Sequence, residues 1–326
     1  MPRQHVVLVT YGEPPAPFFI DQLVYSWRIL IGLTRTVAPI PPVAIPAIAL
    51  ARGFGRRRLW REQEYRSPLE SLTNAQAVAL RHALRVSTNS DDWTVRVAYE
   101  FRRPLLSEVI AEIPASDAVW VAPMYAADST FTHELSRRAV AAAVGDRARP
   151  APVRVLPPIA PEHLADIAAR HVLASAGAGR VGPSTALVLA AHGTLIEPAR
   201  PIETGRAETE RLCEAIRSRL ASSFGLVVNG WLNHTRGGKW TAPAIDESLR
   251  RVRDAGYTQV VYYPYGFLAD NAETQLEGRM ALTAEPSLNA FFVPCLNDSA
   301  ALARLIAEQI RAGTPSRVMD LSARPA

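Results

Sequence analysis

Eight short runs of apolar residues divide the chain, and helical patterns lie between them. The runs are rich in Val, Leu, Ile and Tyr and lack the strict alternation of a half-exposed strand, so they predict strands buried on both faces. They form two sets of four: 5–12, 93–101, 118–125 and 152–159, then 185–193, 225–234, 258–269 and 289–297. Each set predicts a four-stranded parallel sheet with helical crossovers.

Apolar residues spaced three and four apart predict amphipathic helices between these strands. The run 73–85 begins with Thr-Asn, residues that commonly cap helices. Further helices are predicted within 203–221 and 242–256, the second ending at Gly256. The run 299–313 predicts a last helix that closes the chain.

The repeated set of strands indicates two similar domains. A chain of 326 residues is also longer than a single hydrophobic core usually serves. The segment 171–184 is rich in small residues and is predicted to be the connector. We therefore expect an α/β protein with two Rossmann-like domains, one over 1–165 and one over 166–326. We expect the last helix to pack back on the first domain.

An apolar and then basic segment, 29–66, interrupts the first domain, and we call it the lip. Its apolar part, 29–50, contains Arg35 and four prolines. The charge-free run 36–51 is shorter than the ~20 residues of a membrane-spanning helix. The part 51–66 is rich in arginine and supplies much of the net charge of +5. The lip is therefore predicted to cover a pocket or to rest on a membrane surface, with arginines that attract acidic partners.

The cysteine content and the chain start restrict the class of protein. Cys213 and Cys295 are the only cysteines and are far apart, so a cysteine-held zinc or iron–sulfur site is excluded. We expect no tightly bound cofactor, and the cysteine usage fits a reducing compartment. The chain begins almost directly with a strand, so we expect no signal peptide and a cytoplasmic location. No nucleic-acid recognition motif accompanies the basic cluster.

Polar side chains follow several of the predicted strands. In parallel α/β folds, ligands bind outside the carboxyl ends of the strands, so residues at these ends are candidates for function. The candidates are Tyr11 and Tyr125 in the first domain, then His192 and the acids Asp270, Glu273 and Glu277 in the second.

The three acids have two interpretations. At positions i, i+3 and i+7 of a helix they would share one face, where they would repel unless they hold a cation or protons. Alternatively, Asp270 caps the helix, with Glu273 at the third position. A neutral His192 facing these acids could bind a divalent metal or pass protons. A single histidine at a strand end is, however, more often structural.

Six segments resemble, in the right order, motifs of the ferrochelatase family, enzymes that insert ferrous iron into a porphyrin. They are VVLVTYGEPPAP (6–17), EYRSPLESLTNAQAVAL (64–80), APMYAADSTFT (122–132), LAAHG (189–193), HTRGGKWTAPAIDESL (234–249) and PYGFLADNAETQLE (264–277). The resemblance implies a chelatase-like fold with two domains, and it covers most of the chain.

The resemblance also implies roles for individual residues. His192 would be the catalytic base or metal ligand, Glu273 its facing carboxylate and second metal ligand, and Asp270 and Glu277 an acid relay. The porphyrin-binding residues would be Tyr11, Tyr125, Ser129, Thr132, Arg236 and Trp240. Fe²⁺ and protoporphyrin IX or coproporphyrin III would be the substrates. We expect a monomer, with peripheral membrane contact as an alternative to a fully cytoplasmic protein.

Several positions depart from the family's motifs. The signature's histidine is Asn271 and its serine is Ala269, and a Gln-Ser pair is replaced by His234 and Thr235. These differences leave other functions open. One is a chelatase for another tetrapyrrole or metal, and another is a porphyrin- or haem-binding protein without catalysis. A third is a two-domain protein that binds a different small anion.

Overall fold

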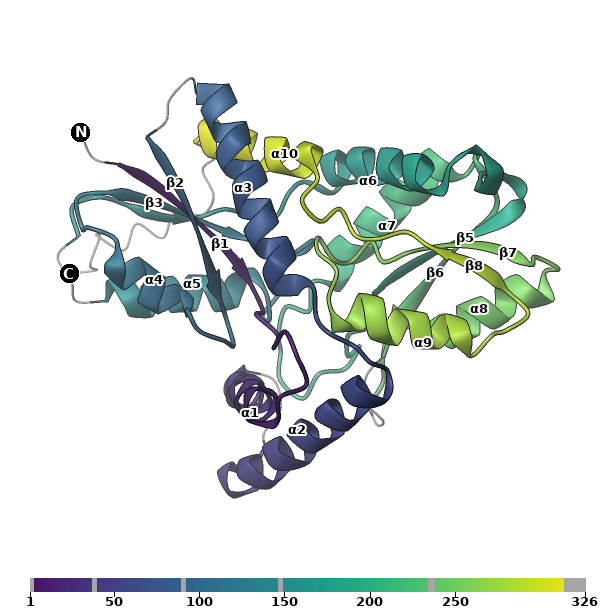
Figure 1. The fold of residues 1–326 in the computed structure, drawn as a ribbon, viewed down its shortest axis with the longest axis horizontal. Helices are drawn as coiled ribbons and strands as arrows, with labels where there is room; N and C mark the ends of the chain where they lie inside the picture. Colours follow the sequence, from purple (N-terminus) through teal and green to yellow (C-terminus); the bar gives the residue numbers. More distant parts are fainter. Residues whose placement is uncertain (1–2, 37–39, 89–91, 146–148, 234–237, 314–326) are drawn as a thin grey trace. The chain divides into compact units, whose positions relative to one another are not determined.

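The computed structural model describes residues 3–36, 40–88, 92–145, 149–233 and 238–313 (Figure 1). The chain forms two compact units. Unit 1 comprises Met1–Pro158 together with Asp298–Ala326, and unit 2 comprises Ile159–Asn297. The division within the chain therefore follows Pro158, and the C-terminal segment belongs to unit 1.

Each unit contains one four-stranded parallel sheet. Unit 1 has strand order β2-β1-β3-β4, and unit 2 has the matching order β6-β5-β7-β8. The strands are β1 (Gln4–Thr10), β2 (Trp93–Tyr99), β3 (Ala118–Pro123) and β4 (Val153–Val155), then β5 (Gly182–His192), β6 (Phe224–Leu232), β7 (Gln259–Tyr263) and β8 (Asn289–Phe292). The prediction of two similar parallel sheets flanked by helices is confirmed.

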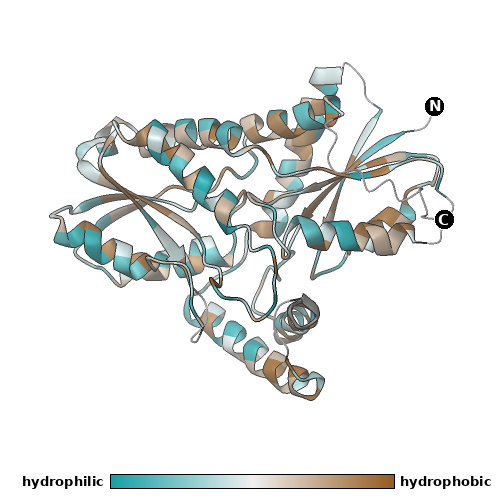
Figure 2. Ribbon diagram, turned by 180° about the vertical axis from the view of Figure 1, so that it is seen from behind, coloured by the Kyte–Doolittle hydropathy of each residue, from teal (hydrophilic) through white to brown (hydrophobic). Residues whose placement is uncertain are grey.

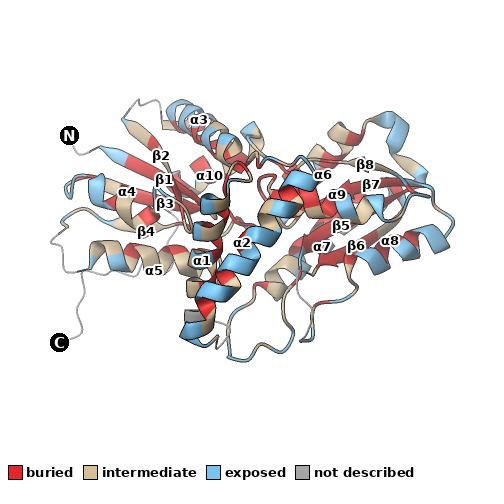
Figure 3. Ribbon diagram, turned by 60° about the horizontal axis from the view of Figure 1, so that its bottom comes forward, coloured by how far each residue is buried: buried red, intermediate tan, exposed pale blue. Residues whose placement is uncertain are grey.

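The central strands are buried because their residues are apolar on both faces. Residues 6–9 of β1 and 186–190 of β5 are fully buried. Figure 2 shows hydrophobic residues along the strands, and Figure 3 shows the same strands as the buried part of each unit. Burial on both faces is the reason that these strands appear as continuous apolar runs in the sequence.

Helices cover the sheets within each unit. Those of unit 1 are α1 (Phe19–Thr36), α2 (Ile45–Glu62), α3 (Leu69–Thr88), α4 (Leu106–Glu112), α5 (His133–Val144) and α10 (Ala300–Arg311). Those of unit 2 are α6 (Pro161–Ala176), α7 (Arg206–Leu220), α8 (Ile245–Asp254) and α9 (Gly278–Thr283). The last helix, α10, packs against α3 (Figure 1). Its N-cap is Ser299, whose hydroxyl accepts a hydrogen bond from the Ala301 amide.

The segment predicted as a connector, 171–184, is wrongly assigned. It forms the end of α6, a short 3₁₀ turn and the start of β5, all inside unit 2. Of the small residues that suggested a linker, Ala176 is buried where α6 packs, whereas Ala174, Ala178 and Gly179 are exposed. Small side chains permit close packing, and the sequence does not distinguish this use from flexibility.

The lip contains the end of α1 and the whole of α2, and these two helices pack together around a small core of Leu30, Ile45 and Ala49. Pro46 lies in the first turn of α2, where proline costs no helical hydrogen bond. Among the described residues, no helix combines the length and apolar character needed to cross a membrane.

Candidate active site

His192 and Glu273 come together at the carboxyl edge of the unit 2 sheet. His192 is the last residue of β5, and Glu273 belongs to the segment that follows the neighbouring strand β7. The Nδ1 atom of His192 lies 3.0 Å from Oε2 of Glu273, which is a hydrogen bond. The side chains are 47% and 30% exposed, so a ligand at this edge can reach both.

The contact determines how the imidazole can act. When Glu273 is ionised it only accepts hydrogen bonds, so Nδ1 of His192 carries the proton and donates it to the carboxylate. In the neutral ring the lone pair is then on Nε2. This tautomer can take a proton or bind a metal ion through Nε2, and the carboxylate balances the positive charge that results.

Close packing after β5 fixes the backbone next to His192. The amide of Gly193 donates to the Leu232 carbonyl over 2.8 Å. A side chain at position 193 would collide with the side chain of Asn233. The His-Gly pair therefore has a physical basis, because only glycine permits this approach of β5 to the end of β6.

Trp240 lies beside the segment that follows His192 in unit 2. The segment after His192 pairs with the segment 239–241, since the Ile196 amide donates to the Lys239 carbonyl and Leu195 bridges to Trp240. Trp240 is half-buried there. The candidate Arg236, by contrast, lies outside the described residues.

Asn271, and not Asp270, caps the helical segment that carries Glu273. The Asn271 side-chain oxygen accepts from the amides of Glu273 at 2.8 Å and Thr274 at 3.3 Å. The predicted capping role of Asp270 is therefore wrong. Both residue types are good N-caps, and the structure uses the second of the two.

The acids do not form a single row on one helix face. A π-helical turn spans Glu273–Glu277 and leads into α9, so Glu273 and Glu277 lie about one turn apart. Asp270 precedes this segment and is buried, with 4% of its surface exposed. The expectation of three acids on one face is thus wrong for Asp270.

Glu277 is half-buried near the sheet. Its negative charge is one cause, after burial and Cys295, that raises the pKa of Tyr262, which places the carboxylate near that buried tyrosine. The Glu277 carboxylate therefore lies near strand β7, further along the segment that begins with Glu273.

Tyr11 and Tyr125 form an aromatic group at the corresponding edge of unit 1. Tyr11 follows β1, and its ring lies 4.8 Å from the Tyr125 ring and 5.8 Å from the Phe101 ring, centroid to centroid. Desolvation, and then the charge of Glu100, raises the pKa of Tyr125 well above its usual value. Its hydroxyl is buried without a hydrogen-bond partner among the described residues.

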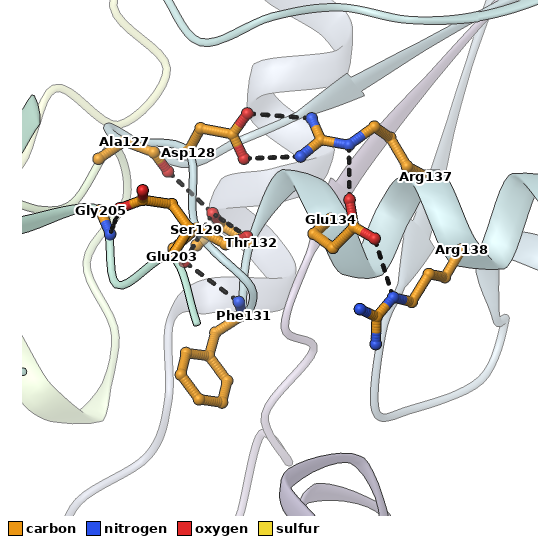
Figure 4. Close-up of polar contacts among 10 residues, drawn as sticks. All are labelled: Ala127, Asp128, Ser129, Phe131, Thr132, Glu134, Arg137, Arg138, Glu203 and Gly205. Atoms are coloured by element: carbon orange, nitrogen blue, oxygen red, sulfur yellow. Dashed lines mark hydrogen bonds and ion pairs between the residues drawn. The ribbon is translucent and has the colours of Figure 1, made fainter. Parts of the chain in front are cut away.

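Ser129 and Thr132 shape the loop between β3 and α5 (Figure 4). The Thr132 hydroxyl donates to the Ala127 carbonyl over 2.8 Å, and the Ser129 oxygen accepts from the Phe131 amide over 3.1 Å. The two hydroxyls are also 3.0 Å apart. Much of their hydrogen-bonding capacity is thus used within the loop, although the resemblance implies porphyrin binding.

Two titratable residues of unit 1, the half-buried Glu100 and the buried His133, were not among the predicted candidates. Glu100 directly follows β2 and accepts a hydrogen bond from the Ser136 hydroxyl over 2.6 Å, and burial raises its pKa to about 7. His133 is fully buried, and desolvation lowers its pKa to about 4. Glu100 could have been found by the strand-end rule that identified Tyr11, whereas nothing in the sequence marks His133 as buried.

The basic cluster of the lip is partly committed to internal contacts. Arg56 donates to the Gln22 side chain over 3.0 Å and lies over the rings of Tyr25 and Trp60. Arg58 is exposed and pairs with Glu62 over 2.7 Å. The large apolar side chains exposed on α1, α2 and their flanks are Phe18, Ile20, Val24, Trp27, Val43, Leu50 and Phe54.

Comparison with known proteins identifies the family of the chain. The sequence model named Ferrochelatase matches residues 3–314. The chain belongs to the ferrochelatase family. It is 25% identical over 335 residues to the ferrochelatase of Sodalis glossinidius, with 95% of each chain covered. It is 26% identical over 321 residues to that of Gluconobacter oxydans, with 91% of this chain and 89% of the relative covered. Family membership supports a metal chelatase.

Solved structures agree with the chelatase fold. SirB from Bacillus subtilis with Fe³⁺ aligns with a TM-score of 0.56 at 10% identity, covering 96% of both chains. CbiX, described as the terminal enzyme of sirohaem biosynthesis in denitrifying bacteria, aligns with a TM-score of 0.51 at 18% identity, covering 95% of this chain and 98% of CbiX. DR2241 from Deinococcus radiodurans gives 0.57 at 17% identity, and the chain spans 56% of that protein. At these identities the likeness shows the fold alone.

Proposed function

We propose that this protein is a ferrochelatase that inserts Fe²⁺ into a porphyrin, protoporphyrin IX or coproporphyrin III, for haem synthesis. The observation that carries the proposal is the 3.0 Å contact between His192 and Glu273 at a ligand-binding sheet edge. The chain belongs to the ferrochelatase family, and the resemblance of its motifs implies that this pair matches the family's catalytic residues.

The chemistry requires a base and a metal-binding group. Metallation replaces two pyrrole N–H bonds by metal–nitrogen bonds and releases two protons. His192 accepts a pyrrole proton or holds the iron through Nε2, and Glu273 stabilises the positive charge that arises. Glu277, one turn further along, extends this acidic path away from His192. Iron here is a substrate that leaves with the product.

Aromatic side chains supply contacts for the macrocycle. In unit 2 Trp240 is held close to the segment that follows His192. In unit 1 the half-buried Tyr11 is the ring that can make such a contact, and the buried Tyr125 packs against it. Flat aromatic rings favour stacking on a porphyrin, which has large apolar faces.

The lip is proposed to contact the porphyrin, with Arg57 and Arg58 near the propionates. The exposed apolar residues of the lip, Val43, Leu50 and Phe54, support this role, because they offer area for the macrocycle. Replacing both arginines (Arg57→Gln with Arg58→Gln) should raise the KM for porphyrin and reduce its dependence on salt. Arg251→Gln, an exposed arginine of α8, is the matched control. An unchanged KM with lost binding to anionic liposomes would identify the lip as a lipid contact instead.

The proposed function is tested by anaerobic incubation of the purified protein with Fe²⁺ and each porphyrin in turn. Movement of the Soret and visible bands reports metal entry, and the two initial rates show which porphyrin is preferred. Tight porphyrin binding without metallation of either ring would contradict the proposal and favour a porphyrin-carrying protein.

A further inference from the structure

We propose that Asp270 and Asn297 form a positioning pair that holds the segment carrying Glu273, and that Asp270 acts through its hydrogen bonds and not as a proton relay. The inference rests on the proposed function, because the segment matters most if Glu273 takes part in metallation. It assigns Asn297 a role that no motif in the sequence indicates.

The two residues bond to each other in both directions. The Asp270 amide donates to Oδ1 of Asn297, and Nδ2 of Asn297 donates to Oδ2 of Asp270, both over 2.9 Å. The Asn297 amide also donates to the Leu268 carbonyl over 2.9 Å. The loop that follows β8 is thereby joined to the loop that follows β7, although the two residues are 27 positions apart.

The second carboxylate oxygen of Asp270 connects to the site itself. Oδ1 accepts from the Cys295 amide over 3.1 Å and from the Thr274 hydroxyl over 3.2 Å. Thr274 directly follows Glu273. Since both oxygens of Asp270 accept hydrogen bonds and only 4% of the residue is exposed, the carboxylate serves as a buried junction.

The hydrogen bonds of Asp270 fix the position of the first turn of the segment that carries Glu273. Asp270 is anchored by Asn297, and the next residue, Asn271, caps the helix at the Glu273 amide. A shift of Asp270 would therefore move the cap and the carboxylate of Glu273 relative to His192. Displacements of about 1 Å in an active site can cost on the order of 10²-fold in rate.

The backbone at Asn297 limits which substitutions are informative. Its φ is +48°, in the left-handed region that asparagine and aspartate tolerate better than most residues. Alanine at 297 would add backbone strain to the loss of hydrogen bonds. Aspartate keeps the backbone conformation and changes only the side-chain amide.

An exchange of the two side chains separates positioning from proton relay. In Asp270→Asn alone, the new side-chain NH₂ group faces the NH₂ group of Asn297, and neither can accept a hydrogen bond. If the new side chain rotates by 180°, its NH₂ group faces the backbone N–H of Cys295 instead. With Asn297→Asp alone, two carboxylates face each other. With both changes, the amide at 270 donates to the carboxylate at 297, and the other hydrogen bonds described above for the pair can be kept.

We expect each single variant to lower kcat by roughly 10- to 100-fold with little change in KM for porphyrin, and the double variant to return to within about threefold of wild type. Asn289→Asp, the same chemical change at the exposed start of β8, should leave kcat unchanged. If the double variant stays as slow as Asp270→Asn, the carboxylate at 270 itself is required and the inference is wrong. A fully active Asp270→Asn would overturn it as well.

Hydrogen exchange of the segment 268–278 tests the pair without any activity measurement. Exchange should be faster in each single variant and return to the wild-type rate in the double variant. If the wild-type protein fails to metallate porphyrin while exchange follows this pattern, the proposed function fails and the positioning pair stands. Equal exchange in all four proteins would contradict the pair.

Discussion

Replacing Asn271 by alanine should loosen the first turn of the segment that carries Glu273. The change removes the acceptor for two backbone amides, those of Glu273 and Thr274, and the donor that reaches the Ala269 carbonyl over 3.2 Å. Loss of an N-cap side chain costs about 0.5–2 kcal/mol. Since about 1.4 kcal/mol corresponds to a factor of ten, the local opening equilibrium should rise by roughly 2- to 30-fold.

Hydrogen exchange measured by mass spectrometry on peptides covering 268–278 would show this loss of protection directly. Asn271→Asp is the matched control, because a carboxylate can accept from the same two amides and should retain most of the protection. We expect kcat to fall in the alanine variant more than in the aspartate variant, since the cap holds Glu273 near His192. Unchanged exchange in Asn271→Ala would refute the assignment of Asn271 as the cap.

Three further predictions concern the two units. Glu273→Gln should lower turnover by at least ~10²-fold and change porphyrin affinity, measured by fluorescence quenching, much less. A variant that loses only affinity would instead identify Glu273 as a binding residue. Gly193→Ala should lower the free energy of unfolding by about 1–3 kcal/mol and reduce turnover, because the new methyl group overlaps Asn233. An unchanged free energy of unfolding would show that the backbone at the end of β5 can shift to make room for the methyl group. Burial raises the pKa of Glu100 from 4.5 to about 7. Between pH 4.5 and pH 7 the folded protein therefore keeps a proton on Glu100 that the unfolded chain loses. The free energy of unfolding should therefore fall by about 3 kcal/mol as pH rises from 4.5 to 7, and Glu100→Gln should remove this fall. Parallel pH profiles for Glu100→Gln and wild type would contradict the raised pKa of this carboxyl.

The sheets could be predicted because their signal is local and strong. Continuous apolar runs such as 6–9 and 186–190 are what burial on both faces requires. The approach of His192 to Glu273 also follows from a simple rule, since the ends of adjacent parallel strands meet at one edge. The segment 171–184 contains the end of α6 and the start of β5, and its small residues look the same as linker residues in a sequence.

The hydrogen bonds around Asp270 could not be predicted. Its partner Asn297 is far away in the chain, and the pairing depends on how the loops after β7 and β8 pack in three dimensions. Likewise, Asp270 and Asn271 are both suitable N-caps, and only the path of the backbone decides between them. Local propensity therefore identified the right segment but assigned the wrong role within it.

The central claim, that the His192–Glu273 pair carries out metallation, is tested most directly by one anaerobic single-turnover measurement. Wild type, His192→Ala and the control His163→Ala, an exposed histidine of α6, are each loaded with porphyrin and mixed with excess Fe²⁺. The account predicts rapid metallation by wild type and His163→Ala. It predicts no enzyme-dependent metallation by His192→Ala, which should still fold and bind porphyrin. Near-wild-type metallation by a folded His192→Ala would contradict it.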